Sequence, residues 1–341
     1  MWRKEGYPFI IAEMSGNHNQ SLERALAIVD AAAAAGVDAI KIQTYTADTM
    51  TLDIDTGEFF IADKDSLWEG ESLYHLYEKA HTPWEWHKSI FDRCRELGIM
   101  GFSTPFDDTS VDFLEELDVP CYKIASFENV DLPLIRKVAR TGKPIIVSTG
   151  MTTVSELEDL VRMARDNGCT DLTLLKCTSN YPSSPEGTNL RTIPHMRELF
   201  GCEVGLSDHT LGIGVAVASV AFGASVIEKH FTLSRADGGV DSAFSLEPDE
   251  MAQLVRECRS AVLAIGEVRY EMAEQEKKSL QFRRSLYIAE DMKAGDVLTE
   301  KNLRRIRPGH GLSPKYYDAI LGKRVNQDVK RGTALSWELL I

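Results

Sequence analysis

Short apolar runs alternate with helix-like segments over the first three quarters of this chain, and this alternation limits its fold more than any other feature. Helix signals, such as the capping boxes that begin at Thr82 and Thr153, separate the runs. Eight runs have the length and the β-branched content of buried strands: residues 8–14, 39–43, 100–103, 121–125, 144–148, 172–177, 204–207 and 226–230. Eight βα units in about 260 residues are typical of a (β/α)8 TIM barrel, which we predict. A doubly wound sheet is the alternative, but it would need a glycine-rich first turn that this chain lacks.

The barrel pattern stops near residue 265. Residues 266–282 are charged and helix-prone, which indicates a linker or a connecting helix. Short β-rich pieces separated by turns follow from residue 283 to the end. We therefore predict a catalytic barrel over 1–265, a linker over 266–282 and a small β-rich domain over 283–341. A domain of this size depends on packing against another surface.

Residues 47–80 interrupt the alternation. The stretch 51–71 is acidic and aromatic, and it follows the second predicted strand. In a barrel this makes it a βα loop at the active face, where long loops usually cover the substrate. We predict such a cover, and an ordinary surface excursion is the open alternative.

Charge and composition exclude several classes of protein. The formal net charge of −14 argues against binding to nucleic acid. No apolar run reaches the roughly 18 residues that span a bilayer. Residues 1–6 lead directly into a predicted strand, so we expect no signal peptide. The six cysteines are scattered without CxxC spacing, which favours reduced thiols in a cytoplasmic protein over disulfides or a zinc ribbon.

Two histidines end successive predicted strands. His209 closes the run 203–209 and His230 closes the run 225–230, with a helix-like segment between them. Because parallel strands of a barrel end at the same edge, both imidazoles would lie together there, as in metal sites that keep positions open for substrate. Two unrelated histidines that cap strands are the alternative. We predict a metal site at this pair.

Lysines and serines lie at the ends of the other predicted strands. A buried ammonium without a partner is costly, so Lys41 and Lys123 at strand ends indicate an anionic ligand. Hydroxyl side chains accompany them: Ser126, Ser148, Ser179 and Ser207. This set fits a small ligand that carries phosphate and carboxylate groups. A Schiff-base aldolase that uses Lys41, Lys123 or Lys176 is the alternative, and the effect of a chelator would distinguish the two.

The strand ends also carry the motifs of a known family. The motifs are IAE at 11–13, NHN at 17–19, KIQTY at 41–45, STPFD at 103–107, YKIAS at 122–126, STGM at 148–151, GLSDH at 205–209, EKHFT at 228–232 and SLEP at 245–248. Together they resemble the sialic acid synthase family, which joins phosphoenolpyruvate to an amino-sugar aldehyde. The C-terminal part, with its Arg307-Pro308-Gly309 run, is similar to the SAF, or antifreeze-like, domain of that family.

The resemblance implies roles for individual residues. His209 and His230 would hold Mn²⁺ or Mg²⁺, of which Mn²⁺ accepts imidazole more readily. Glu13 would act as an acid, a base or a positioning group, or alternatively pair with Lys41, and Asp208 would support catalysis beside the metal. The phosphoenolpyruvate residues would be Lys41, Lys123, Ser126, Ser148, Asn180 and Ser207. The sugar residues would be Asn17, Gln43, Tyr181, Asp241 and Arg307.

Two departures from the usual sialic type resemble the pseudaminic acid branch of the family. They are EMSGNHNQ at 13–20 and GVDSAFSLEP at 239–248. The sugar of that branch lacks the 6-hydroxyl, which implies an apolar pocket wall. Synthesis of N-acetylneuraminate or legionaminate is the alternative. The family also implies a domain-swapped homodimer in which Arg307 reaches the partner's sugar, and the intact strand ends argue against a non-catalytic scaffold for a binding module.

Overall fold

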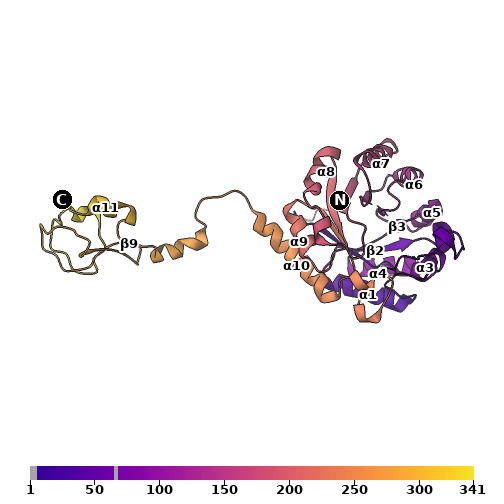
Figure 1. The fold of residues 1–341 in the computed structure, drawn as a ribbon, viewed down its shortest axis with the longest axis horizontal. Coiled ribbons are helices and arrows are strands. Elements are labelled where there is room, and N and C mark those ends of the chain that lie inside the picture. Colours follow the sequence, from indigo (N-terminus) through magenta and orange to yellow (C-terminus); the bar gives the residue numbers. More distant parts are fainter. Residues whose placement is uncertain (1–5, 65–67) are drawn as a thin grey trace. The chain divides into compact units, whose positions relative to one another are not determined.

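The computed structural model describes residues 6–64 and 68–341. The chain divides into two compact units, Met1–Gly266 and Glu267–Ile341. The second unit therefore includes most of the segment that the sequence indicates as a linker. Figure 1 shows the strands of the first unit within a surround of helices.

The first unit is a closed barrel of parallel strands, which confirms the predicted fold. The strands follow chain order around the barrel, and β1 closes it by pairing with β8. They are β1 (Phe9–Glu13), β2 (Ala39–Thr44), β3 (Met100–Pro105), β4 (Tyr122–Ile124), β5 (Ile145–Ser148), β6 (Leu172–Cys177), β7 (Glu203–Asp208) and β8 (Val226–His230). Every strand lies within two residues of its predicted range.

Helices follow the strands on the outside of the barrel. They are α1 (Leu22–Ala35), α4 (His87–Leu97), α5 (Asp108–Glu116), α6 (Leu132–Ala139), α7 (Val154–Asp166), α8 (Thr192–Phe200), α9 (Gly214–Ala221) and α10 (Pro248–Ile265). The predicted capping box at Thr153 is present at the start of α7. The one predicted at Thr82 is wrong, because Thr82 lies 3.3 Å from His18 Nε2 and a 3₁₀ turn, Trp84–Trp86, precedes α4. The segment after β2 forms α2 (Ala47–Met50) and α3 (Leu73–Ala80).

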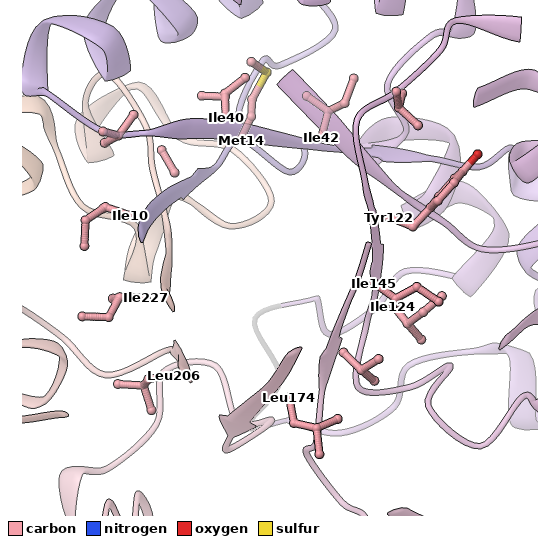
Figure 2. Close-up of a cluster of buried hydrophobic side chains, with 14 of the residues drawn as sticks. Ile10, Met14, Ile40, Ile42, Tyr122, Ile124, Ile145, Leu174, Leu206 and Ile227 are labelled. Carbon is pink, nitrogen blue, oxygen red and sulfur yellow. The ribbon is translucent and has the colours of Figure 1, made fainter. Parts of the chain in front are cut away.

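Strand residues alternate between two apolar layers. Ile11 and Val226 point into the barrel and join Phe9, Phe102, Ile146 and Leu175 in a small inner cluster. Ile10 and Ile227, their neighbours in sequence, point outward and pack with the helices in the larger cluster, part of which is drawn in Figure 2. This two-residue period follows from strand geometry. It also decides which polar residues at the strand ends face the interior.

The second unit has its own apolar core. Strands β9 (Ser285–Ile288) and β10 (Leu303–Ile306) pair antiparallel, and α11 (Tyr317–Ile320) contributes Ile320 to the core. Elsewhere in this unit, Val297 makes a single antiparallel bridge to Arg324, and Tyr287 makes one to Ala334. Residues Glu274–Phe282 form a 3₁₀ helix ahead of β9.

Two further predictions concern membrane-spanning segments and the state of the cysteines. Among the described residues, no helix combines the length and the apolar character that crossing a membrane requires. All six cysteines are free thiols. The cytoplasmic location itself stays a prediction.

Candidate active site

A cavity of about 530 Å³ lies at the carboxyl ends of the barrel strands. The insertion between β2 and α4 contributes part of its lining, as the sequence predicts for a cover. Twelve of the predicted site residues line it: Glu13, Lys41, Gln43, Lys123, Ser126, Ser148, Asn180, Tyr181, Ser207, His209, His230 and Asp241. Strands far apart in sequence therefore bring these side chains together. Their individual roles stay predictions.

Two lysines and two glutamates form a buried charge cluster on the floor of this cavity. Lys41 Nζ lies 2.7 Å from Glu13 Oε2 and 3.8 Å from Glu228 Oε1. Lys123 Nζ lies 3.5 Å from the same Glu228 oxygen and donates a hydrogen bond of 2.7 Å to Ser148 Oγ. All four side chains are almost fully buried. Glu13 thus pairs with Lys41, which is the alternative role that the sequence suggested for it.

In this cluster, the cost of burying each charge is offset by neighbouring charges of opposite sign. Burial would raise the pKa of Glu228, but Lys123 and Lys41 outweigh it and lower that pKa. Burial also opposes the charge on Lys41, and the carboxylates of Glu13 and Glu228 reverse the effect and raise its pKa. The pKa of Lys123 is lowered, since its burial is only partly offset by Glu228. Lys123 is therefore the cation that gains most from an incoming anion.

The two predicted metal histidines lie side by side, with ring centroids 5.4 Å apart. His209 Nδ1 is 3.0 Å from the carbonyl oxygen of Thr178, so that nitrogen donates, and in the neutral ring Nε2 carries the lone pair. His230 Nδ1 is buried without a hydrogen-bond partner and lies 3.6 Å from Asp241 Oδ2. Burial, together with neighbouring His209, holds the pKa of His230 well below its usual range, so this ring is neutral.

These two rings fit a catalytic rather than a structural metal site. Within residues 6–64 and 68–341, no group of three or more His, Cys, Asp or Glu is placed to hold a metal ion. Two imidazoles supply two ligands and leave the remaining positions for water or substrate. The orphaned Nδ1 of buried His230 is a polar atom that a bound ion would satisfy.

Asp208 requires a correction. Ser207 and His209 face the cavity, so strand alternation turns Asp208 outward, into the layer between β7 and the helices. There its Oδ2 lies 2.9 Å from Lys229 Nζ, and both side chains are 1% exposed. Lys229 also donates to the carbonyl oxygens of Thr210 and Gly212. Asp208 is thus a brace behind the site and does not reach the reacting atoms.

Asn17 and Arg307 also lie outside the cavity lining. Asn17 Nδ2 donates to the carbonyl oxygen of Phe231 and to Ser245 Oγ, each at 2.9 Å, and so holds the loop after β8. The sugar-binding role predicted for Asn17 stays a prediction. Arg307 belongs to the second unit, where it lines a hollow with three other arginines, Arg284, Arg304 and Arg305. Its predicted role stays a prediction.

Three carboxylates of the cavity lining were not predicted from the sequence: Asp63, Glu128 and Glu228. Glu228 lies two residues before His230 on β8, so the inward direction of His230 already implies that Glu228 points inward. Glu128 follows β4 in a loop, and no strand period places it. Burial raises the pKa of Glu128 to about 7, and its Oε2 is buried without a hydrogen-bond partner. A carboxyl with such a pKa suits proton transfer near neutral pH.

A closed parallel barrel with a polar cavity at the carboxyl ends of its strands is the architecture of a TIM-barrel enzyme. The NeuB family model matches residues 28–270, and the SAF domain model matches residues 283–341. The chain therefore belongs to the NeuB family and carries a C-terminal SAF domain.

Named relatives and a solved structure agree with this assignment. The chain is 46% identical to the pseudaminic acid synthase of Campylobacter jejuni, over 96% of this chain and 95% of the relative. It is 44% identical to the pseudaminic acid synthase of Helicobacter pylori, over 96% of each. The crystal structure of an N-acetylneuraminic acid synthetase from Leptospira borgpetersenii matches with a TM-score of 0.70 and 31% identity, covering 81% of this chain and 91% of that one.

We expect Lys229→Met to destabilise the barrel by about 3–5 kcal/mol, because it leaves the Asp208 carboxylate buried without its partner. The control is Lys143→Met, which breaks the more exposed pair between Lys143 and Glu115 and should cost about 0–1 kcal/mol. Denaturant unfolding of both variants measures the difference. Similar losses in the two variants would contradict the brace.

We expect Glu128→Gln to change the pH dependence of stability. The ordinary pKa of Glu128 is 4.5 and its folded pKa is about 7, so the folded state favours the protonated form. The stability from this group is complete below pH 4.5 and is lost as pH rises through 7. Relative to the variant, the wild type should therefore lose melting temperature between about pH 5 and pH 8. Glu158→Gln, on an exposed part of α7, is the matched control, and parallel profiles for wild type and Glu128→Gln would refute the assignment.

Proposed function

We propose that this chain condenses phosphoenolpyruvate with 2,4-diacetamido-2,4,6-trideoxy-β-L-altropyranose and water, giving pseudaminic acid and phosphate. The observation that carries the proposal is one cavity that joins a floor of paired lysines, glutamates and hydroxyls to a pair of imidazoles. The identity of 46% to a pseudaminic acid synthase over nearly the whole chain supports this choice of sugar.

Phosphoenolpyruvate would bind at the floor. Lys123 already donates to Ser148 Oγ, and Ser126 Oγ accepts from the backbone amide of Gly150, so the hydroxyls are held before the ligand arrives. Ser207 Oγ lies 3.4 Å from Glu228 Oε1 at the same floor. Charge-assisted hydrogen bonds from these groups would hold phosphate and carboxylate oxygens. Lys41 and Asn180 would complete this set.

The sugar aldehyde would lie near His209 and His230, with Gln43, Tyr181 and Asp241 around it. Gln43 Nε2 donates to Glu13 Oε1 at 2.9 Å, and the Tyr181 ring contacts the His209 ring at a tilt of 47°, with centroids 4.4 Å apart, so both side chains have fixed positions. We propose that the two histidines hold Mn²⁺ or Mg²⁺. When bound, such an ion acts as a Lewis acid toward a carbonyl oxygen.

The bond changes follow from the two substrates. C3 of phosphoenolpyruvate attacks the aldehyde carbon, a C–C bond forms, and the aldehyde oxygen takes up a proton. Water adds at C2 and gives up a proton, and the tetrahedral intermediate loses phosphate as its C2–O bond breaks. Glu13 and Glu128, whose pKa values are raised by burial, are the groups of this chain suited to move these protons.

A product assay tests the proposal directly. The purified chain is incubated with phosphoenolpyruvate and each of three sugars, the precursors of pseudaminic, legionaminic and N-acetylneuraminic acid. Mass spectrometry identifies the acid formed, and phosphate release gives the rate. We expect the highest kcat/KM with the pseudaminic acid precursor. Preference for either other sugar would replace the proposed product with that of the alternative branch.

We expect His209→Ala and His230→Ala each to abolish turnover and to weaken Mn²⁺ binding while the fold is kept. His209 directly follows β7 and His230 ends β8, and the apolar residues of both strands remain in place, so circular dichroism should be nearly unchanged. Calorimetric titration with Mn²⁺ measures binding without turnover. Near-normal, chelator-sensitive activity in either variant would rule out the metal assignment.

Oxygen labelling reports which bond of phosphoenolpyruvate breaks. Because water adds at C2, the bridging oxygen should leave with phosphorus. Phosphoenolpyruvate with ¹⁸O at the bridging position should therefore yield labelled phosphate, measured by mass spectrometry. Label retained in the sugar acid would instead indicate P–O cleavage and contradict the mechanism.

We also propose a domain-swapped homodimer in which the SAF domain of one chain completes the cavity of the other. The hollow lined by four arginines, including Arg307, supports this, since guanidinium groups suit carbonyl and acidic partners and the whole chain is acidic. Arg307 would then reach an acetamido oxygen of the partner's sugar.

Mixing two inactive chains tests the swap. Arg307→Ala and His230→Ala each leave one defect, so a mixed dimer should regain one intact site if Arg307 acts in trans. We expect phosphate release to recover in the mixture and not in either parent. Absence of recovery in isolated heterodimers would place Arg307 in its own chain's site or outside catalysis.

A further inference from the structure

Helix α3 presents an apolar face to the cavity instead of to the barrel core. Its lining residues are Leu73, Leu76, Tyr77 and Ala80, spaced i, i+3, i+4 and i+7, which places them on one side of the helix. None of the residues of α3 is fully buried. None of them belongs to the cluster that packs the other helices on the barrel. This face is therefore free to meet a ligand.

Two further segments extend this face into an apolar wall, which consists of Met50, Ile61, Leu73 and Leu76. Backbone pairing holds Ile61 in place, because its amide donates to Glu71 and its carbonyl accepts from Gly70, both at 2.9 Å. The end of this ribbon is joined to α3 through Ser72, whose Oγ caps the helix at His75. Backbone hydrogen bonds thus hold the segment that carries Ile61 against the start of α3.

The remaining lining divides the cavity by chemistry. The floor of the cavity carries Lys41, Lys123 and Glu228, whereas the four wall side chains are all apolar. Asp63 and Tyr77 add a carboxylate and a hydroxyl to the same lining. Tyr45, at the end of β2, joins the two regions, with its ring 5.8 Å from Tyr77. The cavity thus offers charged groups at its floor and apolar side chains at the wall.

We infer that this wall contacts the terminal carbon of the acceptor sugar and selects a sugar whose C6 carries no hydroxyl. The inference rests on the proposed function, which places the aldehyde at the histidines and leaves the far end of the sugar chain for the wall. A 6-hydroxyl against Ile61, Leu73 and Leu76 would lose its hydrogen bonds to water and gain none. A methyl group at the same place loses nothing. Discrimination by an apolar pocket of this kind is roughly 10- to 100-fold in kcat/KM.

The test compares two sugars that differ only in the 6-hydroxyl, each with saturating phosphoenolpyruvate. Wild type should prefer the 6-deoxy sugar by roughly 10-fold or more. Leu76→Asn and Ile61→Asn, on separate segments, should each reduce this ratio at least about fivefold by supplying a hydrogen-bonding group, and the KM for phosphoenolpyruvate should stay unchanged. Leu76→Met should keep the preference. Leu199→Asn, which places the same change on the exposed surface of α8, is the control for a nonspecific effect.

The possible outcomes separate failure of the proposed function from failure of the wall. No turnover of either sugar by the wild type would refute the proposed function rather than the wall. Turnover of both sugars with equal kcat/KM by the wild type would overturn the inference without any variant. A wild-type preference that both Asn variants retain would overturn it as well. Two positions are used so that a folding defect in one, detected by its melting temperature, leaves the other as a test.

Discussion

The inward and outward alternation of residues in a closed barrel is the constraint on which the site depends. On β8, Val226, Glu228 and His230 point inward, whereas Ile227 and Lys229 point outward. On β7 the same rule sends Ser207 into the cavity and Asp208 behind it. Closure of the barrel then brings inward residues from distant strands to one mouth. The chemistry of the cavity is thus a consequence of register, and a shift of one residue would exchange the charged floor for the apolar outer layer.

The charge cluster shows how ionisable side chains are accommodated at the carboxyl ends of the barrel strands. Burial opposes the charge of Lys41 and Lys123, and the carboxylates of Glu13 and Glu228 beside them offset that cost. The balance differs between the two lysines, because the pKa of Lys41 is raised and that of Lys123 is lowered. Lys123 stands on the side where the hydroxyls gather, so the cluster is electrostatically incomplete there. The floor of the cavity is therefore electrostatically asymmetric before any ligand binds.

The barrel and most of the cavity could be predicted from the sequence because they depend on local signals. Strand runs, the cap at Thr153 and the strand-end histidines are all readable over a few residues. The failures have physical causes. The sequence from Thr82 matches a capping box, but the Thr82 hydroxyl contacts the ring of His18 instead of capping a helix. Asp208 was misassigned because adjacency to His209 in sequence places it on the opposite face. Glu128 lies in a loop with no period, and its perturbed pKa comes from burial that only the folded chain creates.

The separate origins of the floor and the wall have an evolutionary consequence. The ions and imidazoles belong to the ends of barrel strands, so their positions are fixed by strand register. The apolar wall comes from a single excursion between β2 and α4, held together by its own backbone pairing. Insertions and substitutions there leave the strands untouched. A barrel of this design can acquire a new acceptor by remodelling one loop while the carbon-bond chemistry is inherited unchanged, so divergence among relatives should be concentrated in that excursion.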